Sequence, residues 1–203
     1  MNRESKMPRV LNIGDSITAG YTPFVVTILT GEADVTCAGT GTTGHGLENL
    51  DKLLGGGGWD VIHFNWGLHD LCYRHPEAKP YGHRDKVNGT IGTPLDQYET
   101  NLDKLVGRLK ATGAKLIWAT TTVVPEGEAG RFVGDEIKYN RVAGKVMAEY
   151  GIVTNDLYGL TSGFGKDMFV LPGDVHYSPD GYRKIAEQVA SAIRTALQSQ
   201  PAQ

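Results

Sequence analysis

The chain contains 203 residues, a length that suits one α/β domain. Hydrophobic residues make up 40% of the chain and charged residues 21%, which is typical of a globular protein with a sizeable core. The net charge of −3 and the scattered Lys and Arg residues argue against nucleic acid as a partner, because phosphate binding requires a clustered basic surface.

The first nine residues, Met1 to Arg9, are polar and lead directly into an apolar run. They lack the apolar segment of a signal peptide, and no later apolar run approaches the ~20 residues needed to span a bilayer. The chain as given therefore predicts a cytoplasmic protein with no membrane association. A secreted protein whose leader had been removed would look the same.

Apolar runs and helical patterns alternate along the chain. The runs at 10–13, 35–38, 61–64, 116–119 and from Ile152 onward predict five buried strands. Helices are expected at 18–29, around the leucines from 47 to 54, from 95 to just before 113, at about 135–150 and from 179 to about 197. Thr93 and Ser178 each precede a proline and are the expected N-caps of the third and last helices. The alternation predicts an α/β fold with a parallel five-stranded sheet covered on both faces, in a single domain spanning 1–203.

Cysteines and histidines give no sign of a metal site. Cys37 and Cys72 are the only cysteines and do not form a Cys-x-x-Cys pair, so we expect two buried free thiols. His63 lies in the middle of a predicted strand and is interpreted as a satisfied core residue. Three other histidines lack the spacing of metal ligands: His45, His75 and His83.

Two short motifs carry the groups needed for serine hydrolysis. Ser16 follows the first predicted strand, and Asp174 and His176 stand just before the final helix. These residue types supply a nucleophile, a base and a carboxylate that orients the base. Sites in parallel sheets form at the carboxyl ends of strands, which is where Ser16 falls. Asp167 and Asp180 are weaker candidates for the carboxylate.

Four sequence blocks occur in a fixed order: Gly14-Asp15-Ser16-Ile17-Thr18, a glycine-rich loop at 39–46, the segment 65–70, and the segment 174–182. In this order and spacing the chain resembles the GDSL esterase/lipase superfamily, also called SGNH hydrolases, over nearly its whole length. The resemblance implies a flavodoxin-like three-layer α/β/α fold. It also implies ester hydrolysis through Ser16, His176 and Asp174, with no metal or organic cofactor.

The chain departs from the usual pattern of the family at two places. The third block usually reads Gly-x-Asn-Asp, with the Asn donating to the oxyanion, but here His69 stands in that place and Asn65 lies four residues earlier. We favour Asn65 as the donor, with His69 as the alternative, because an amide donates at any pH. The backbone N–H groups of Ser16 and Gly41 are the other expected donors, with Gly44 as an alternative to Gly41. In the last block the family usually spaces Asp three residues before His, whereas here the spacing is two.

The glycine loop also supports a reading from another class of protein. The pattern Gly39-x-Gly41-x-x-Gly44 after a strand matches a dinucleotide-binding fingerprint, so a nucleotide-binding module is an alternative. Against it, the loop follows the second strand, and the acid about 20 residues later, Asp60, stands at the start of a strand. A catalytically inactive protein of the same fold is a further alternative.

The segment 72–92 is long for a loop in such a fold and is polar, with interspersed tyrosines, rather than apolar. A polar lid favours short acyl chains and a polar alcohol. We therefore expect a small ester as substrate, with the O-acetyl group of a carbohydrate as the leading candidate. Lysophospholipase or thioesterase activity of the same fold is the alternative. Expected substrate contacts are Asp15, Trp66 and Tyr73, although the tyrosines could instead pack the loop down or form a homo-oligomer contact.

Overall fold

The computed structural model describes residues 7–199, so most of the polar N-terminal segment discussed above lies outside the described residues. Five strands form one parallel sheet in the order β2-β1-β3-β6-β7. Counted by the strands of this sheet alone, the order is 2-1-3-4-5, which is that of flavodoxin-like folds. The strands are β1 (Arg9–Gly14), β2 (Asp34–Gly39), β3 (Val61–Phe64), β6 (Lys115–Ala119) and β7 (Val153–Asn155).

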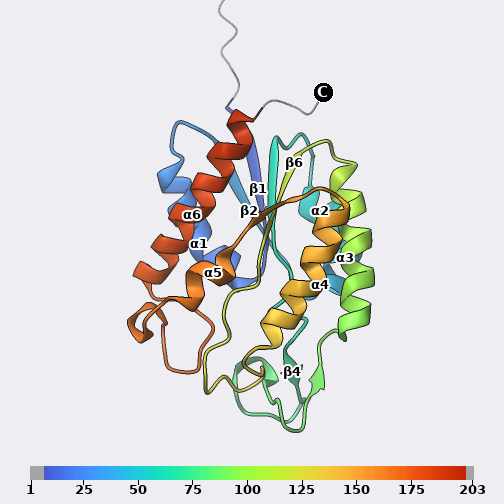
Figure 1. The fold of residues 1–203 in the computed structure, drawn as a ribbon, viewed down its shortest axis with the longest axis vertical. Helices are drawn as coiled ribbons and strands as arrows, with labels where there is room; N and C mark the ends of the chain where they lie inside the picture. Colours follow the sequence, from blue (N-terminus) through green and yellow to red (C-terminus); the bar gives the residue numbers. More distant parts are fainter. Residues whose placement is uncertain (1–6, 200–203) are drawn as a thin grey trace, which may run out of the picture.

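Helices cover both faces of the sheet, so the fold has the three layers that were expected (Figure 1). On one face lie α1 (Ser16–Ile28), α5 (Leu157–Ser162) and α6 (Pro179–Gln198). On the other lie α2 (Thr43–Leu54), α3 (Leu95–Lys110) and α4 (Asp135–Glu149). Among residues 7–199, no helix is both long enough and apolar enough to cross a membrane.

The helix ends follow from local capping chemistry. Asp15 and Ser178 are N-caps whose side chains accept hydrogen bonds from the backbone N–H groups of Ile17 and Gly181. The expected N-cap at Thr93 is wrong, because α3 begins at Leu95 without a side-chain cap. The amide of Thr93 instead donates to the carbonyl oxygen of Asp70.

The central strands are buried and the edge strand β2 is not. The five residues of β1 from Val10 to Gly14 are all buried, as is the whole of β3, because neighbours flank these strands and helices cover them. Cys72 is buried as expected, but Cys37 is exposed, because it lies on the edge strand. His63 is a satisfied core residue, hydrogen-bonded to Tyr21 and Asn155, and burial lowers its pKa to about 3.

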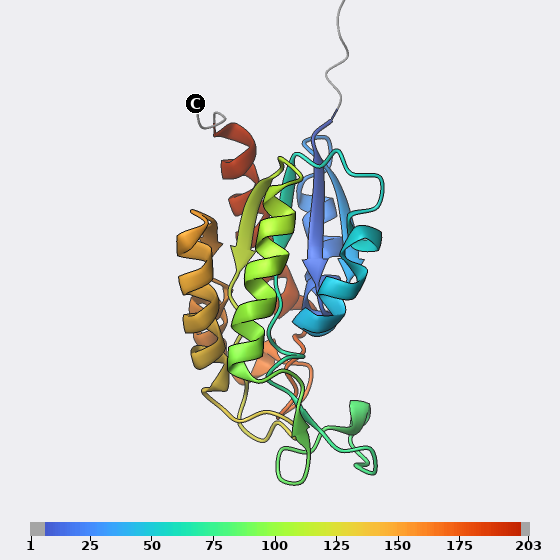
Figure 2. The ribbon, with the colours of Figure 1, turned by 90° about the vertical axis from the view of Figure 1, so that its right-hand side faces the viewer.

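The long segment 72–92 is tied to the rest of the protein rather than being an open loop. It contains a two-stranded antiparallel pair, β4 (Tyr73–Arg74) with β5 (Thr90–Ile91), and the short 3₁₀ helix η1 (Tyr81–His83). The amide of Tyr73 donates to the carbonyl oxygen of Gly130 at 2.7 Å. Figure 2 shows this segment projecting beyond the carboxyl ends of the strands, at the lower end of the molecule.

The strand register brings the functional segments together. β1 pairs with both β2 and β3, so Gly14 lies opposite Gly39, and Ile13 lies opposite Phe64. The loops that follow these three strands therefore leave the same edge of the sheet. The strand order reverses between β1 and β3, which is the position where ligands bind in such sheets.

Candidate active site

Ser16 is the first residue of α1, immediately after the turn that ends β1. It is exposed, and no residue in the described part of the chain accepts a hydrogen bond from its backbone N–H. The start of a helix carries a partial positive charge and unpaired N–H groups. This position therefore favours negative charge developing beside Ser16.

His176 and Asp174 lie with Ser16 in one hydrogen-bonded chain. Ser16 Oγ is 2.8 Å from His176 Nε2, and His176 Nδ1 is 2.6 Å from Asp174 Oδ1. The same carboxylate oxygen accepts the backbone N–H of His176 at 3.0 Å. Burial opposes ionisation of Asp174, but these two hydrogen bonds hold its pKa below its usual value. The two-residue spacing of Asp and His therefore permits the contact.

The two weaker carboxylate candidates lie elsewhere. Asp167 belongs to the 3₁₀ helix η2 (Lys166–Met168), and Asp180 lies on α6, 4.0 Å from Arg183. Neither contacts His176 within the described residues.

An aromatic cluster anchors the loop that carries His176. The backbone of Tyr177 pairs with that of Phe169, and the buried Tyr177 ring packs against Phe164, Phe169 and Tyr182. The carbonyl oxygen of His176 accepts the N–H of Val170 at 3.0 Å. These contacts hold the imidazole in position over Ser16.

The two candidate oxyanion donors after β3 have different surroundings. Asn65 is buried, and its side-chain nitrogen donates to the carbonyl oxygen of Ala119 at 2.8 Å. His69 instead lines the same cavity as Ser16 and His176. Burial, more than any other factor, lowers the pKa of His69 and keeps its ring neutral near pH 7. The geometry therefore shifts the preference from Asn65 to His69.

The glycine loop is held against the site by two contacts. The amide of Thr40 donates to the carbonyl oxygen of Gly14 at 2.8 Å, which places Gly41 next in the loop. In the described structure nothing accepts the N–H of Gly41, whereas Gly44 already lies within the first turn of α2. The buried carboxylate of Asp70 binds both the N–H and the hydroxyl of Thr43 at the start of that helix. Asp70 had no predicted role, although it closes the third sequence block.

A cavity of about 190 Å³ opens beside Ser16. Asp15 lines it, but two expected substrate contacts do not. Trp66 is 1% exposed, and its ring is packed against Gly46 and Phe64, so it belongs to the core. Tyr73 packs edge-on against Phe132 outside the cavity wall. Tyr81, which is 86% exposed, is the tyrosine that lines the cavity.

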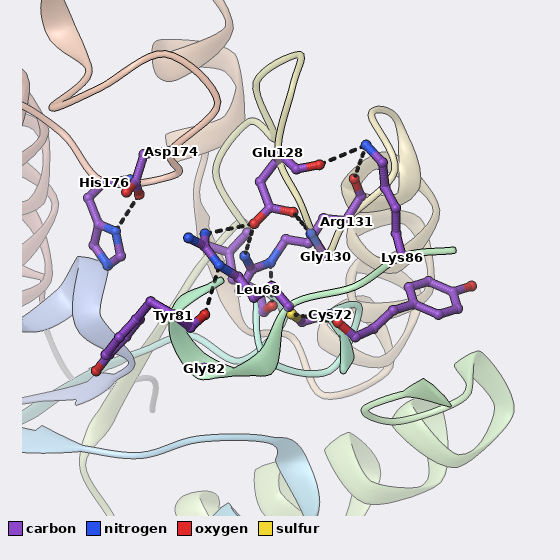
Figure 3. Close-up of polar contacts among 12 residues, drawn as sticks. Leu68, Cys72, Tyr81, Gly82, Lys86, Glu128, Gly130, Arg131, Asp174 and His176 are labelled. Atoms are coloured by element: carbon purple, nitrogen blue, oxygen red, sulfur yellow. Dashed lines mark hydrogen bonds and ion pairs between the residues drawn. The ribbon is translucent and has the colours of Figure 1, made fainter. Parts of the chain in front are cut away.

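Three arginines also line the cavity: Arg74, Arg84 and Arg131. Figure 3 shows Glu128 and Arg131 on one side, with His176, Asp174 and Tyr81 on the other. Sequence patterns gave no sign of this group. Arg84 and Arg131 lie 47 positions apart, and only the fold brings them to a shared partner, Glu128.

The alternative of a nucleotide-binding module gains no support. Asp60 lies before β3, at the opposite end of the strand from the glycine loop, and its carboxylate accepts the backbone N–H of Arg9. An acid at that end cannot reach a nucleotide bound at the loop. Among residues 7–199, no group of three or more His, Cys, Asp or Glu side chains is arranged to hold a metal ion.

Comparisons with known proteins identify the family of the chain. The chain matches the model of the GDSL-like lipase/acylhydrolase family over residues 13–184. A comparison with curated protein sequences gives no match.

Solved structures with similar folds, three of which follow, span nearly the whole chain. A lipase/acylhydrolase from Enterococcus faecalis is 22% identical, with a TM-score of 0.76, over 97% of this chain and 100% of its own. The acetyl xylan esterase AlAXEase is 18% identical, with a TM-score of 0.72, over 91% of this chain and 99% of its own. An α/β hydrolase enzyme from the metagenome of Lake Arreo, Spain, is 17% identical, with a TM-score of 0.72, over 95% of this chain and 97% of its own. The chain therefore belongs to the GDSL-like lipase/acylhydrolase family and is a carboxylic ester hydrolase.

Proposed function

We propose that the protein hydrolyses short-chain carboxylic esters through Ser16, His176 and Asp174, and that its substrates are O-acetyl groups on a carbohydrate. The observation that carries this proposal is the hydrogen-bonded chain from Ser16 through His176 to Asp174, with distances of 2.8 and 2.6 Å. It stands at the edge of a cavity that a small ester can enter.

In the proposed reaction, His176 Nε2 accepts the proton of Ser16 Oγ as the oxygen attacks the ester carbonyl carbon. Asp174 accepts the other ring N–H, which fixes the tautomer and stabilises the imidazolium that forms. The protonated His176 then donates to the leaving alcohol, and the acyl group stays on Ser16. A water molecule, deprotonated by the same imidazole, attacks this acyl-enzyme and releases the acid.

The negative oxygen of the tetrahedral intermediate requires donors that are already in place. We assign the backbone N–H groups of Ser16 and Gly41 and a ring N–H of His69 to this role. The amides of Ser16 and Gly41, which no residue of 7–199 accepts, and the position of His69 on the cavity wall support the assignment. A neutral imidazole has a single N–H, so the tautomer that donates into the cavity is required.

The small cavity supports a short acyl group. Ligand sites for drug-sized molecules usually measure about 300–1,000 Å³, and this cavity is smaller, at about 190 Å³. Its wall carries three arginines, which a long hydrocarbon chain would desolvate unfavourably. Among the similar folds, one is an acetyl xylan esterase, which agrees with removal of acetyl groups from a sugar.

A panel of p-nitrophenyl esters from acetate to octanoate, together with acetylated sugars, tests the proposal. We expect the highest kcat/KM for acetate and release of acetate from at least one sugar. A preference for octanoate over acetate would contradict the short-chain assignment and favour a lysophospholipase-like or thioesterase-like enzyme.

The Ser16→Ala variant tests the nucleophile. We expect it to lose turnover and labelling by a phosphonate while keeping the thermal stability of the parent. Ser191→Ala, at an exposed position on α6, is the matched control and should keep turnover and phosphonate labelling. Substantial activity in Ser16→Ala would overturn the mechanism.

A further inference from the structure

The wall of the cavity beside Ser16 carries three arginines, and one of them, Arg74, has no acidic partner among residues 7–199. Arg74 and Arg84 face each other across an isolated antiparallel bridge within the segment 72–92, and Arg131 reaches the same cavity from the segment before α4. Like charges directly opposite one another on paired strands are destabilising. Such an arrangement indicates a requirement other than stability.

Glu128 is the acid that contacts this group. Its side chain is fully buried, and one oxygen, Oε1, lies 2.8 Å from Arg84 and 3.0 Å from Arg131. The other oxygen accepts the N–H of Gly130 at 2.6 Å. One carboxylate thus serves two arginines.

Arg74 has no acidic partner among residues 7–199. Its guanidinium donates to the carbonyl oxygen of Gly82, which carries no net charge. Two of the three arginines thus have an ion-pair partner in Glu128, and the charge of Arg74 has none among these residues. A structural ion pair with Glu128 would need only one of the three arginines.

The other two acids near the site already have partners. Asp15 caps α1 by accepting the N–H of Ile17 at 2.9 Å, and Asp174 binds His176. Neither forms an ion pair with an arginine of the cavity. The guanidinium of Arg74 is therefore available to an anionic group of a ligand.

The arginines are close enough to act on the reacting groups. Burial is the main cause of the lowered pKa of His69; the charge of Asp15 opposes it, and the charges of Arg131 and Arg74 lower the pKa further. Arg84 is likewise among the groups that oppose the effect of burial on Asp174. An anion held by these arginines would lie next to the ester bond that Ser16 attacks.

We infer that the natural substrate is a small ester bearing an oxyanionic group, such as a carboxylate, which binds Arg74 and Arg84 while Ser16 attacks the ester. The inference rests on the proposed esterase function. Arginine suits this role because its planar fork of donors matches the geometry of a carboxylate. Tyr81, whose carbonyl oxygen accepts Arg84 Nε at 3.1 Å, adds an aromatic face at the same wall. An O-acetylated acidic sugar combines these features with the proposed chemistry.

Matched aryl acetates test the inference. We would measure kcat/KM for 4-acetoxybenzoate, 4-acetoxybenzenesulfonate and the neutral 4-acetoxybenzamide, and divide each by the rate at which hydroxide hydrolyses the same ester. We expect at least one anionic ester to exceed the neutral one by about tenfold or more, because hydrogen bonds between charged groups are strong. Comparison of the two anionic esters shows whether the site prefers a carboxylate or a sulfonate. The preference should fall as salt is added.

Variants of Arg74 connect the preference to the cavity. Arg74→Gln should reduce the anionic-to-neutral ratio about tenfold, and Arg74→Lys, which keeps the charge, should retain part of it. Arg141→Gln, at an exposed position on α4, is the matched control and should leave the ratio as in the parent. Thermal unfolding of each variant shows whether it is folded.

A binding measurement gives a second readout if Arg74→Gln is unstable. In Ser16→Ala, calorimetry should detect glucuronate binding more tightly than glucose. The difference should vanish at about 0.5 M added salt, because the salt screens the attraction between the charges. Hydrolysis of all three acetates at equal normalised rates, with no effect of Arg74→Gln on the ratio, would overturn the inference and leave the esterase function intact. If none of the three acetates is hydrolysed, both the inference and the proposed esterase function are overturned.

Discussion

The carboxylate of Asp70 accepts two hydrogen bonds from Thr43, one from its backbone N–H at 2.8 Å and one from its hydroxyl at 2.7 Å. This contact joins the segment after β3 to the first turn of α2. It therefore fixes the distance between His69, which precedes Asp70, and Gly41, which precedes Thr43 in the glycine loop. Two of the proposed oxyanion donors depend on this one buried carboxylate for their relative position.

The Asp70→Asn variant should change how stability depends on pH. Burial raises the pKa of Asp70 to about 6, above the value of about 4 expected in the unfolded chain. The folded state therefore binds a proton more readily, and this group makes stability fall as pH rises from about 4 to about 6. Asparagine cannot ionise but still accepts both bonds from Thr43. As the pH rises from 4 to 7, the free energy of unfolding of the variant should therefore increase by on the order of 2 kcal/mol relative to that of the parent.

Urea unfolding at several pH values measures this difference. Asp34→Asn, at an exposed position on β2, is the control and should follow the parent. Parallel stability curves for Asp70→Asn and the parent would show that Asp70 is not shifted as described.

Replacement of His69 should distinguish the two oxyanion candidates. His69→Ala should lower kcat about 10²–10³-fold, the usual effect of losing one oxyanion donor. His69→Asn restores an amide donor at this position and should recover part of the loss. Asn65→Ala should act mainly on stability, because the Asn65 side chain donates to the carbonyl oxygen of Ala119. A larger loss of kcat in Asn65→Ala than in His69→Ala would return the role to Asn65.

The Asp174→Asn variant tests the carboxylate of the proposed triad. An amide at this position can donate to His176 Nδ1 and stabilise the wrong tautomer, so we expect kcat to fall by about 10³–10⁴-fold with little change in KM. Asp167→Asn and Asp180→Asn are the matched controls, because neither side chain contacts His176, and both should remain active. Steady-state kinetics with p-nitrophenyl acetate compares the three, and equal losses would remove Asp174 from the mechanism.

Two helix glycines should respond oppositely to alanine. A Cβ atom on Gly20 in α1 would overlap the ring of Tyr182 on α6, whereas one on Gly144 in α4 would lie 4.0 Å from the nearest atom of Trp118. Gly20→Ala should therefore destabilise the protein by about 1–3 kcal/mol, the usual cost of overpacking. Gly144→Ala should stabilise it by about 0.5–1 kcal/mol, because alanine loses less backbone entropy in a helix. Denaturant unfolding of both variants checks the sign of each change.

Much of the fold could be predicted because its signals are local. The apolar runs at 10–13 and 61–64 fall within β1 and β3, and Ser178 is the N-cap of α6. Local patterns failed where tertiary contacts replaced them. Thr93 does not cap α3, because the helix begins at Leu95 and Pro94 occupies the N-cap position. The exposed Cys37 reflects the edge position of β2, which alternation alone does not give. The assignment of a single domain to 1–203 stays a prediction.

The site was partly accessible to sequence reasoning for the same reason. The order of the blocks pointed to Ser16 and His176, which lie within hydrogen-bonding distance. The orientation of Asn65 and the burial of Trp66 depend on side-chain packing, which residue order does not encode. Of the cavity arginines, Arg74 and Arg84 lie in the segment 72–92 and Arg131 precedes α4, and these two segments meet only in three dimensions.

Ser16 and His176 are 160 positions apart, and this separation has a consequence for synthesis on the ribosome. The serine emerges with the first strand, but its proposed base follows only after β7, when all five strands of the sheet have been made. A chain that ends prematurely, before residue 176, carries the serine without the imidazole. If Ser16 and His176 act as proposed, hydrolysis of an activated ester during expression reports only chains that have been translated beyond residue 176.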